Sequence, residues 1–196
     1  MTAAKFQFEK NLETINVLGG LYDYFSGQLK AIDLSELLRA QYIMLVSALD
    51  HYVHTRVREG LLDIFYDNTK SSPKISISSK IVKLLLQEQD EYEQRRILDA
   101  EVRNILSKDS YQSTRSIENA FGLIEIKKIW SSIASGFGKS AEDIINTLNL
   151  IVTRRNKIAH ESDINPTTGN KEYIDKNIVS DTIIFIKTLI CEFDKL

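Results

Sequence analysis

The 196-residue chain is 43% hydrophobic and 27% charged, which are ordinary proportions for a globular protein that builds its own core. Its formal net charge of −2 at pH 7 excludes a global basic field, so any contact with nucleic acid must come from a local patch or from one shared between subunits. The single cysteine, Cys191, excludes an internal disulfide and a cysteine-based zinc site.

Signals for secretion and for membrane insertion are missing from the sequence. Residues 1–10 lack the basic-then-apolar order of a secretory signal, and no run of about 18 apolar residues occurs. We therefore expect a cytoplasmic protein without a membrane partner.

Two long helices are predicted at the start of the chain, because the sequence has only two prolines and eight glycines to interrupt them. Apolar residues at helical spacing predict the first helix over 5–28, with Gly19-Gly20 as the point where it would bend. Asp33 or Ser35 can cap the second helix, whose clear 3.6-residue apolar period runs to about Phe65.

Further helices are predicted after a polar segment. Residues 67–78 are rich in Ser, Asn, Lys and Pro and predict a loop. The pattern is helical again over 79–106, although Glu91–Arg96 is nearly all polar and predicts a solvated or kinked stretch. Another apolar period predicts a helix over 113–134.

Turn signals divide the last third of the chain. A glycine-containing turn is predicted over 135–139, and Ser140 then starts a helix that reaches roughly His160. Residues 163–171 break that helix, and a final helix is predicted over 174–193. No segment shows sustained alternation of apolar and polar residues, so the fold class is all-α, a bundle with long antiparallel helices.

One charged residue breaks the pattern of the helix that starts at Ser140. Arg155 falls near the middle of its apolar stripe, on the face that should enter the core. Such a violation tends to mark a functional or strained site, and a guanidinium there must find a carboxylate, phosphate or carbonyl partner. The stripe consists of Ile144, Leu148, Ile151, Ile158 and Ala159.

His160 lies five positions after Arg155, roughly 140° around a regular helix, so the two side chains would not reach one small ligand. The two could meet if the arginine stem reaches around, if the helix unwinds near His160, or if a second subunit completes the site. Asn156 is placed to orient the imidazole. Arg154 and Lys157 supply positive charge for a phosphate backbone.

These residue types suit cleavage of RNA by its own 2′-hydroxyl. A histidine can take the hydroxyl proton or protonate the leaving 5′-oxygen near neutral pH. An arginine can stabilise the charge that builds on the phosphate oxygens, so that no metal or other cofactor is required. The alternative interpretation is that Arg155 forms a structural ion pair and His160 only complements the negative end of its helix.

The segment Arg155-Asn156-Lys157-Ile158-Ala159-His160-Glu161 resembles the hallmark of the HEPN superfamily, an arginine and a histidine separated by a short spacer that often begins with a polar residue. The segment Ala48–His54 is similar to the first long helix of the RiboL-PSP-like HEPN branch. The resemblance implies one HEPN-like helical domain over 1–196 and a dimer whose two motifs face one cleft. It also implies, in many members, RNase activity in toxins or anti-phage systems.

On the second predicted helix, Asp50 and His54 lie together at the border of the apolar stripe, whereas His51 points towards the opposite, polar side. We expect Asp50 to be the intramolecular partner of Arg155 and His54 to be a supporting or substrate contact, with a solvated Asp–His pair as the alternative. The facing of His51 favours a solvated surface position. A transition-metal site on these three residues would need a further ligand from elsewhere, and we disfavour it.

The segment Gly136-Phe137-Gly138-Lys139-Ser140 imitates the end of a phosphate-binding P-loop. The first glycine of that motif would fall at Ile133, and a helix rather than a strand precedes the segment. We therefore interpret it as a turn that joins two helices.

The sequence thus predicts a metal-independent RNA endonuclease, a toxin or anti-phage defence effector that acts on RNA as a homodimer with a composite site of Arg155 and His160. A cognate antitoxin or regulatory protein is a further expected partner. The alternative is a HEPN-like module that binds nucleotides, RNA or a partner protein without cleavage. A structural scaffold is the third interpretation, and it requires Arg155 to be fully paired inside one subunit. The supporting or substrate-binding residues are Asn156, Asp50, His54, Arg154 and Lys157.

Overall fold

The computed structural model describes residues 1–29, 32–67 and 74–196, and this part of the chain is all-α, with one isolated β-bridge between Ile164 and Lys171. Its helices are α1 (Ala3–Gln28), α2 (Ser35–Tyr66), α3 (Ser79–Gln87), α4 (Glu91–Leu106), α5 (Thr114–Leu123), α6 (Ile129–Phe137), α7 (Ala141–Glu161) and α8 (Lys176–Phe193).

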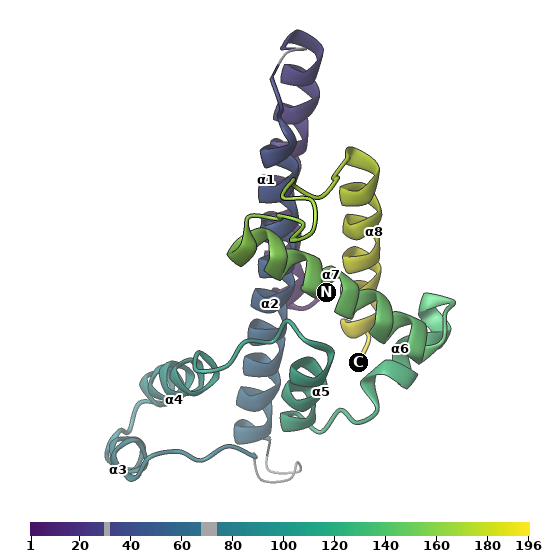
Figure 1. Ribbon diagram of the computed structural model, residues 1–196. Helices are drawn as coiled ribbons and strands as arrows, with labels where there is room; N and C mark the ends of the chain where they lie inside the picture. Colours follow the sequence, from purple (N-terminus) through teal and green to yellow (C-terminus); the bar gives the residue numbers. More distant parts are fainter. Residues whose placement is uncertain (30–31, 68–73) are drawn as a thin grey trace.

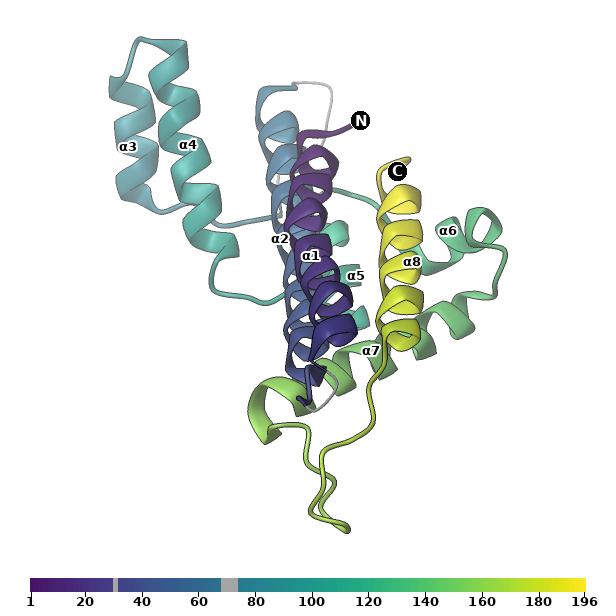
Figure 2. The same cartoon turned by 90° about the horizontal axis from the view of Figure 1, so that it is seen from above.

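Helix α2 is the central element of the bundle. It pairs along its length with α1 (Figure 1, Figure 2), and α4, α5, α7 and α8 also pack against it. This position requires apolar side chains on most of its circumference, and Leu45, Leu49, Tyr52 and Val53 are completely buried. Helix α7 crosses α2, and α6 fills the angle between α7 and α8. The predicted all-α bundle is therefore confirmed.

Polar side chains define where most of these helices begin. In six of them the residue before the first turn accepts a hydrogen bond from a backbone N–H of that turn, which satisfies a donor that the helix itself leaves unpaired. These N-cap residues are Thr2, Ser78, Asp90, Ser113, Ser140 and Asp175. Helix α2 differs from the prediction, because Leu34 precedes it and Asp33 accepts from the N–H of Ser35 without forming the cap.

The helix predicted over 79–106 is in fact a helical hairpin, α3–α4. The break lies at Glu88–Asp90, directly before the polar stretch where a kink was expected. Asp90 explains the difference, since its carboxylate accepts the N–H of Glu93 at 3.0 Å and so starts a new helix. The hairpin projects from the side of α2, which it contacts through α4 (Figure 2).

The helix predicted over 113–134 is also divided, into α5 and α6. Glu125 and Lys128 have left-handed backbone conformations (φ 68° and 53°), which a continuous helix does not allow. Helix α6 then runs to Phe137, further than predicted, and Gly138 ends it with φ 68°. The interpretation of this glycine-containing segment as a helix-joining turn is confirmed.

The remaining predicted elements agree with the structure. Helix α1 continues through Gly19-Gly20 without a break, and α8 starts at Lys176, two residues later than predicted. Half of the loop predicted over 67–78 lies outside the described residues, because the placement of 68–73 is not described, and the described residues 67 and 74–78 are not helical. In the described ranges no helix combines the length and the apolar character needed to cross a bilayer.

Candidate functional site

Helix α7 carries the arginine–histidine motif and is fixed at both ends by its own sequence. Ser140 accepts the N–H of Asp143 at 3.1 Å, and two carboxylates in the first turn complement the positive end of the helix dipole. At the other end, Ser162 takes a left-handed conformation (φ 52°) and donates its N–H to the carbonyl of Lys157. The helix therefore presents the motif on its last two turns.

Arg155 is half-buried, and among the residues that the structure describes it has no carboxylate partner. One of its terminal nitrogens donates to Oδ1 of the exposed Asn156 at 3.1 Å. Its Nε is buried and has no hydrogen-bond partner, and in the described part of the chain no acidic side chain forms an ion pair with it. A buried guanidinium N–H without a partner is costly, so Arg155 is the motif residue best prepared to accept an anionic group.

Arg154, one residue earlier, is in the opposite situation. Its Nη2 donates to Oδ2 of Asp163 at 2.7 Å and to the carbonyl of Tyr173 at 3.1 Å. The carboxylate of Asp163 is completely buried. Arg154, which we expected to face a phosphate backbone, is instead part of a buried ion cluster.

The same cluster includes Arg39, from the first turns of α2. Arg39 Nε donates to Asp163 Oδ2 at 2.9 Å, and its Nη2 donates to the carbonyl of Glu172 at 2.6 Å. Asp163 has φ 60°, and its own N–H donates to the carbonyl of Lys157. This Arg39–Asp163–Arg154 cluster therefore joins the start of α2, the end of α7 and the 162–175 connection, and it holds the motif in place.

Sequence reasoning missed Arg39 and Asp163, although a signal for Arg39 existed. Arg39 stands three residues before the buried Tyr42 and so lies on the apolar stripe of α2, as Arg155 does on α7. Arg39 is only 4% exposed. The rule that singled out Arg155 would have singled out Arg39 as well.

His160 is exposed in the last turn of α7, and no hydrogen bond to it is formed within the described ranges. Because α7 remains helical through Glu161, unwinding of the helix near His160 is wrong as a way to bring His160 to Arg155. Asn156 accepts a hydrogen bond from Arg155, whereas we expected its side chain to orient the imidazole of His160. Two ways for the side chains of Arg155 and His160 to meet remain. Either the long side chain of Arg155 reaches around the helix, or a second subunit completes the site.

Lys157 is half-buried on the same two turns of the helix. Its carbonyl is the acceptor that ends α7, since the N–H groups of Ser162 and Asp163 both donate to it. Its ammonium group adds a positive charge to the last turns of α7, on another side of the helix from Arg155.

Asp50 and His54 lie together on α2, as predicted, but Asp50 does not serve Arg155. Its Oδ1 accepts the backbone N–H of Tyr111 at 2.5 Å and lies 3.8 Å from His54 Nε2. The ring of His54 also packs against Tyr111, with 4.5 Å between ring centroids. The carboxylate thus anchors the connection between α4 and α5, and in the described structure no ion pair joins it to Arg155.

His51 is exposed, as predicted from its position on the polar side of α2. Together with His54 it lines a pocket of about 390 Å³ between α2 and the end of α4. Burial by the pocket walls and the neighbouring His54 lower the pKa of His51. Among the residues that the structure describes, no group of three His, Cys, Asp or Glu side chains is arranged to hold a metal ion.

Comparison with known protein families identifies the fold. The sequence profile of the RiboL-PSP-HEPN family matches residues 7–196, which is nearly the whole chain. The protein belongs to this HEPN family. No curated protein and no solved structure matches the chain.

Membership of the HEPN family confirms the resemblance read from the sequence and agrees with the all-α architecture. The family match shows that the chain contains a HEPN-type module. HEPN domains are often ribonucleases. Helix α7 carries Arg155 and His160, the arginine and histidine that the resemblance in sequence assigned to the HEPN motif.

Proposed function

We propose that this HEPN protein is a metal-independent RNA endonuclease that works as a homodimer. In this proposal Arg155 stabilises the transition state and His160 acts as general acid or general base. The observation that carries the proposal is the contrast between adjacent arginines: Arg154 is paired with the buried Asp163, whereas Arg155 has a buried Nε without a partner. If the protein were only a structural scaffold, Arg155 would have to be paired inside its own subunit. In the described residues its side chain contacts the amide of Asn156 and no carboxylate.

The geometry of α7 favours a site that two subunits share. On a regular helix Arg155 and His160 project roughly 140° apart, and α7 is helical through both residues. If the two α7 helices of a symmetric dimer face one another, Arg155 of one subunit can meet His160 of the other. Each dimer then has two equivalent sites.

The chemistry needs only the RNA, solvent water and these side chains. The 2′-hydroxyl oxygen attacks the adjacent phosphorus and loses its proton to a base, while the bond from phosphorus to the 5′-oxygen breaks and that oxygen gains a proton. His160 supplies one of these transfers, because an imidazole can act as general acid or general base, and solvent water supplies the other. Arg155 stabilises the negative charge that builds on the phosphoryl oxygens. The products are a 2′,3′-cyclic phosphate and a 5′-hydroxyl.

The supporting residues divide into two groups. Asn156 holds the guanidinium of Arg155, and Lys157 adds positive charge for the phosphate backbone. Arg154, by contrast, positions the helix end through Asp163. An RNase of this kind damages its own host, so a toxin or anti-phage effector controlled by a cognate antitoxin or regulatory protein is the biological role we propose.

The test is cleavage of total cellular RNA in the presence of EDTA, by the wild type and by His160→Ala. We expect cleavage by the wild type only, with 2′,3′-cyclic phosphate ends, because loss of the proton-transfer group costs about 10²–10⁴-fold in rate. Glu161→Ala is the matched control, since Glu161 is the exposed neighbour of His160 and has no assigned role. Equal cleavage by wild type and His160→Ala would refute the catalytic role. RNA that is bound by both proteins but stays intact would support the binding module.

A further inference from the structure

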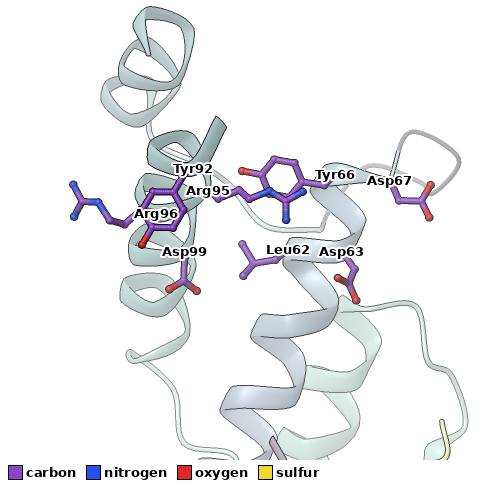
Figure 3. Close-up of a pocket in the computed structure, with 8 residues that line it drawn as sticks. All are labelled: Leu62, Asp63, Tyr66, Asp67, Tyr92, Arg95, Arg96 and Asp99. Atoms are coloured by element: carbon purple, nitrogen blue, oxygen red, sulfur yellow. The ribbon is translucent and has the colours of Figure 1, made fainter. Parts of the chain in front are cut away.

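The pocket between the end of α2 and α4 has a volume of about 580 Å³ and is lined mostly by charged side chains (Figure 3). The guanidinium of Arg95 lies over the ring of Tyr66, 4.3 Å from its centroid. Arg96 pairs with Glu93, with 2.8 Å between the two side chains. Both arginines that line this pocket are therefore engaged by other residues of the chain.

A different pocket, of about 350 Å³, lies between α1, α2 and the first turns of α8, which pack side by side (Figure 1, Figure 2). Gln41 of α2 lines it, and we call it the Gln41 pocket. Asp23 and Lys176 are the charged residues of its lining, and they pair with each other at 2.6 Å. The other described residues that line it are uncharged. Because the two charges cancel, the pocket suits a neutral ligand.

Gln41 places a buried amide in this pocket. The residue is only 5% exposed, and its amide forms no hydrogen bond with any other residue that the structure describes. The amide lies against the backbone of α1, because a Cβ added at Gly19 would be 2.9 Å from its Nε2 and 3.5 Å from its Oε1. An amide that is removed from water without a partner is costly, so pairing with a ligand would relieve that cost.

Gly19 and Gly20 leave α1 without side chains along this pocket, although glycine is unfavourable inside a helix. At Gly19 the reason is close packing, since a side chain there would displace the amide of Gln41. At Gly20 an added Cβ would meet nothing within 4 Å, so packing does not require a glycine. The second glycine therefore keeps space open in the lining.

The remaining walls suit a small planar molecule. Leu38, Val179 and Ile183 present apolar surfaces from α2 and α8, which match the faces of a flat ring. The volume is at the lower end of the range of about 300–1,000 Å³ for small-molecule sites, so a single ring system fits better than a nucleotide. The amide of Gln41 offers an N–H donor beside a carbonyl acceptor, and the matching ligand edge carries an acceptor beside a donor.

We propose that the Gln41 pocket binds a small, neutral, planar molecule whose edge carries a hydrogen-bond donor next to an acceptor, the edge that nucleobases and carboxamides share. Gln41 pairs with this edge through two hydrogen bonds, as a glutamine side chain can pair with adenine. The phosphate of a nucleotide is disfavoured, because Lys176 is already paired with Asp23. This binding does not depend on ribonuclease activity.

The test is isothermal titration calorimetry of the full chain with adenine and uracil as nucleobases and with nicotinamide as a carboxamide. We expect saturable binding of one molecule per chain for at least one of the two classes, and the class that binds identifies the source of the ligand. AMP should bind no more tightly than adenine, because the cation of the pocket is engaged by Asp23.

Variants assign the binding to the pocket. Gln41→Leu keeps the approximate size of the side chain and removes the amide, so it should weaken binding about tenfold or more. The matched control is Gln87→Leu at an exposed position of α3, which should leave the Kd unchanged. Gly20→Leu fills the open space with a good helix former and should also weaken binding, which keeps the test open if Gln41→Leu misfolds.

Urea unfolding of the ligand-free proteins supplies a second readout. Gln41→Leu should be at least as stable as the wild type, because its amide makes no hydrogen bond that the change would break. A marked loss of stability would reveal a structural partner for the amide and count against the proposal. The proposal is overturned if none of the three probes binds, if Gln41→Leu and Gly20→Leu bind like Gln87→Leu, or if AMP binds more tightly than adenine.

Discussion

At the scale of single residues, the neighbours Arg154 and Arg155 determine how the site is understood. The helical pattern placed Arg155 on the inward face of α7, and the structure agrees, because it is half-buried. The pattern gave no sign that Arg154 would be the paired residue. Its partner Asp163 reaches it only because Ser162 and Asp163 both take left-handed conformations, which sequence periodicity does not predict.

The buried carboxylate of Asp163 supplies a prediction about stability. Asp163→Asn keeps the shape of the side chain and tolerates the left-handed backbone, but it removes the charge that balances Arg39 and Arg154. We expect the free energy of unfolding to fall by about 3 kcal/mol, since an uncompensated buried charge is left behind. Urea unfolding followed by circular dichroism measures it. Asp181→Asn, at an exposed position of α8, is the control and should change stability little.

His51 supplies a prediction about pH. Its pKa is lowered in the folded protein, first by burial and then by His54, whereas in the unfolded chain it stays near the ordinary value of 6.5. As pH falls below 6.5, the unfolded state therefore takes up this proton first, and stability is lost between 6.5 and the lower folded pKa. We expect His51→Gln to lose less stability than the wild type between pH 7 and pH 5, as judged by urea midpoints. Parallel losses in the two proteins would contradict this account.

At the scale of elements, the sequence predicted the existence of helices better than their ends. The continuous helices α1, α2, α7 and α8 were predicted nearly to the residue, because each carries a long apolar period. The two helices that proved to be broken have apolar spacing on both sides of the break. Their interruptions depend on a local cap at Asp90 and on the left-handed Glu125 and Lys128, which the period does not record.

The break between α5 and α6 has a role in packing that can be tested. A Cβ added at Gly60 of α2 would lie 2.8 Å from the side chain of Ile124, in the connection between the two helices. We expect Gly60→Ala to lower the free energy of unfolding by about 1–3 kcal/mol through this overlap. Gly20→Ala is the matched change on α1, where a Cβ meets nothing within 4 Å, and it should stabilise by about 0.5–1 kcal/mol. Thermal unfolding of both variants compares them, and equal effects would exclude the contact as the cause.

At the scale of the whole molecule, the all-α class and the HEPN family were predicted from the sequence, because one short motif and the helical periods are both local features. The predicted pairing of Asp50 with Arg155 is wrong, because the partner of Asp50 is the N–H of Tyr111, 61 positions away in the chain. The pocket between α2 and α4 that His51 and His54 line was also not predicted, since it depends on how the α3–α4 hairpin folds back on α2. Long-range contacts of this kind leave no period in the sequence.

The central claim, a composite site of Arg155 and His160 shared between two subunits, is tested most directly by a heterodimer. Arg155→Ala and His160→Ala chains with different tags are co-expressed, and the mixed dimer is isolated on both tags and assayed on RNA in EDTA. If each site takes Arg155 from one subunit and His160 from the other, one of its two sites is intact, and we expect about half of the wild-type rate while either variant alone is inactive. A heterodimer as inactive as the separate variants would contradict the shared site.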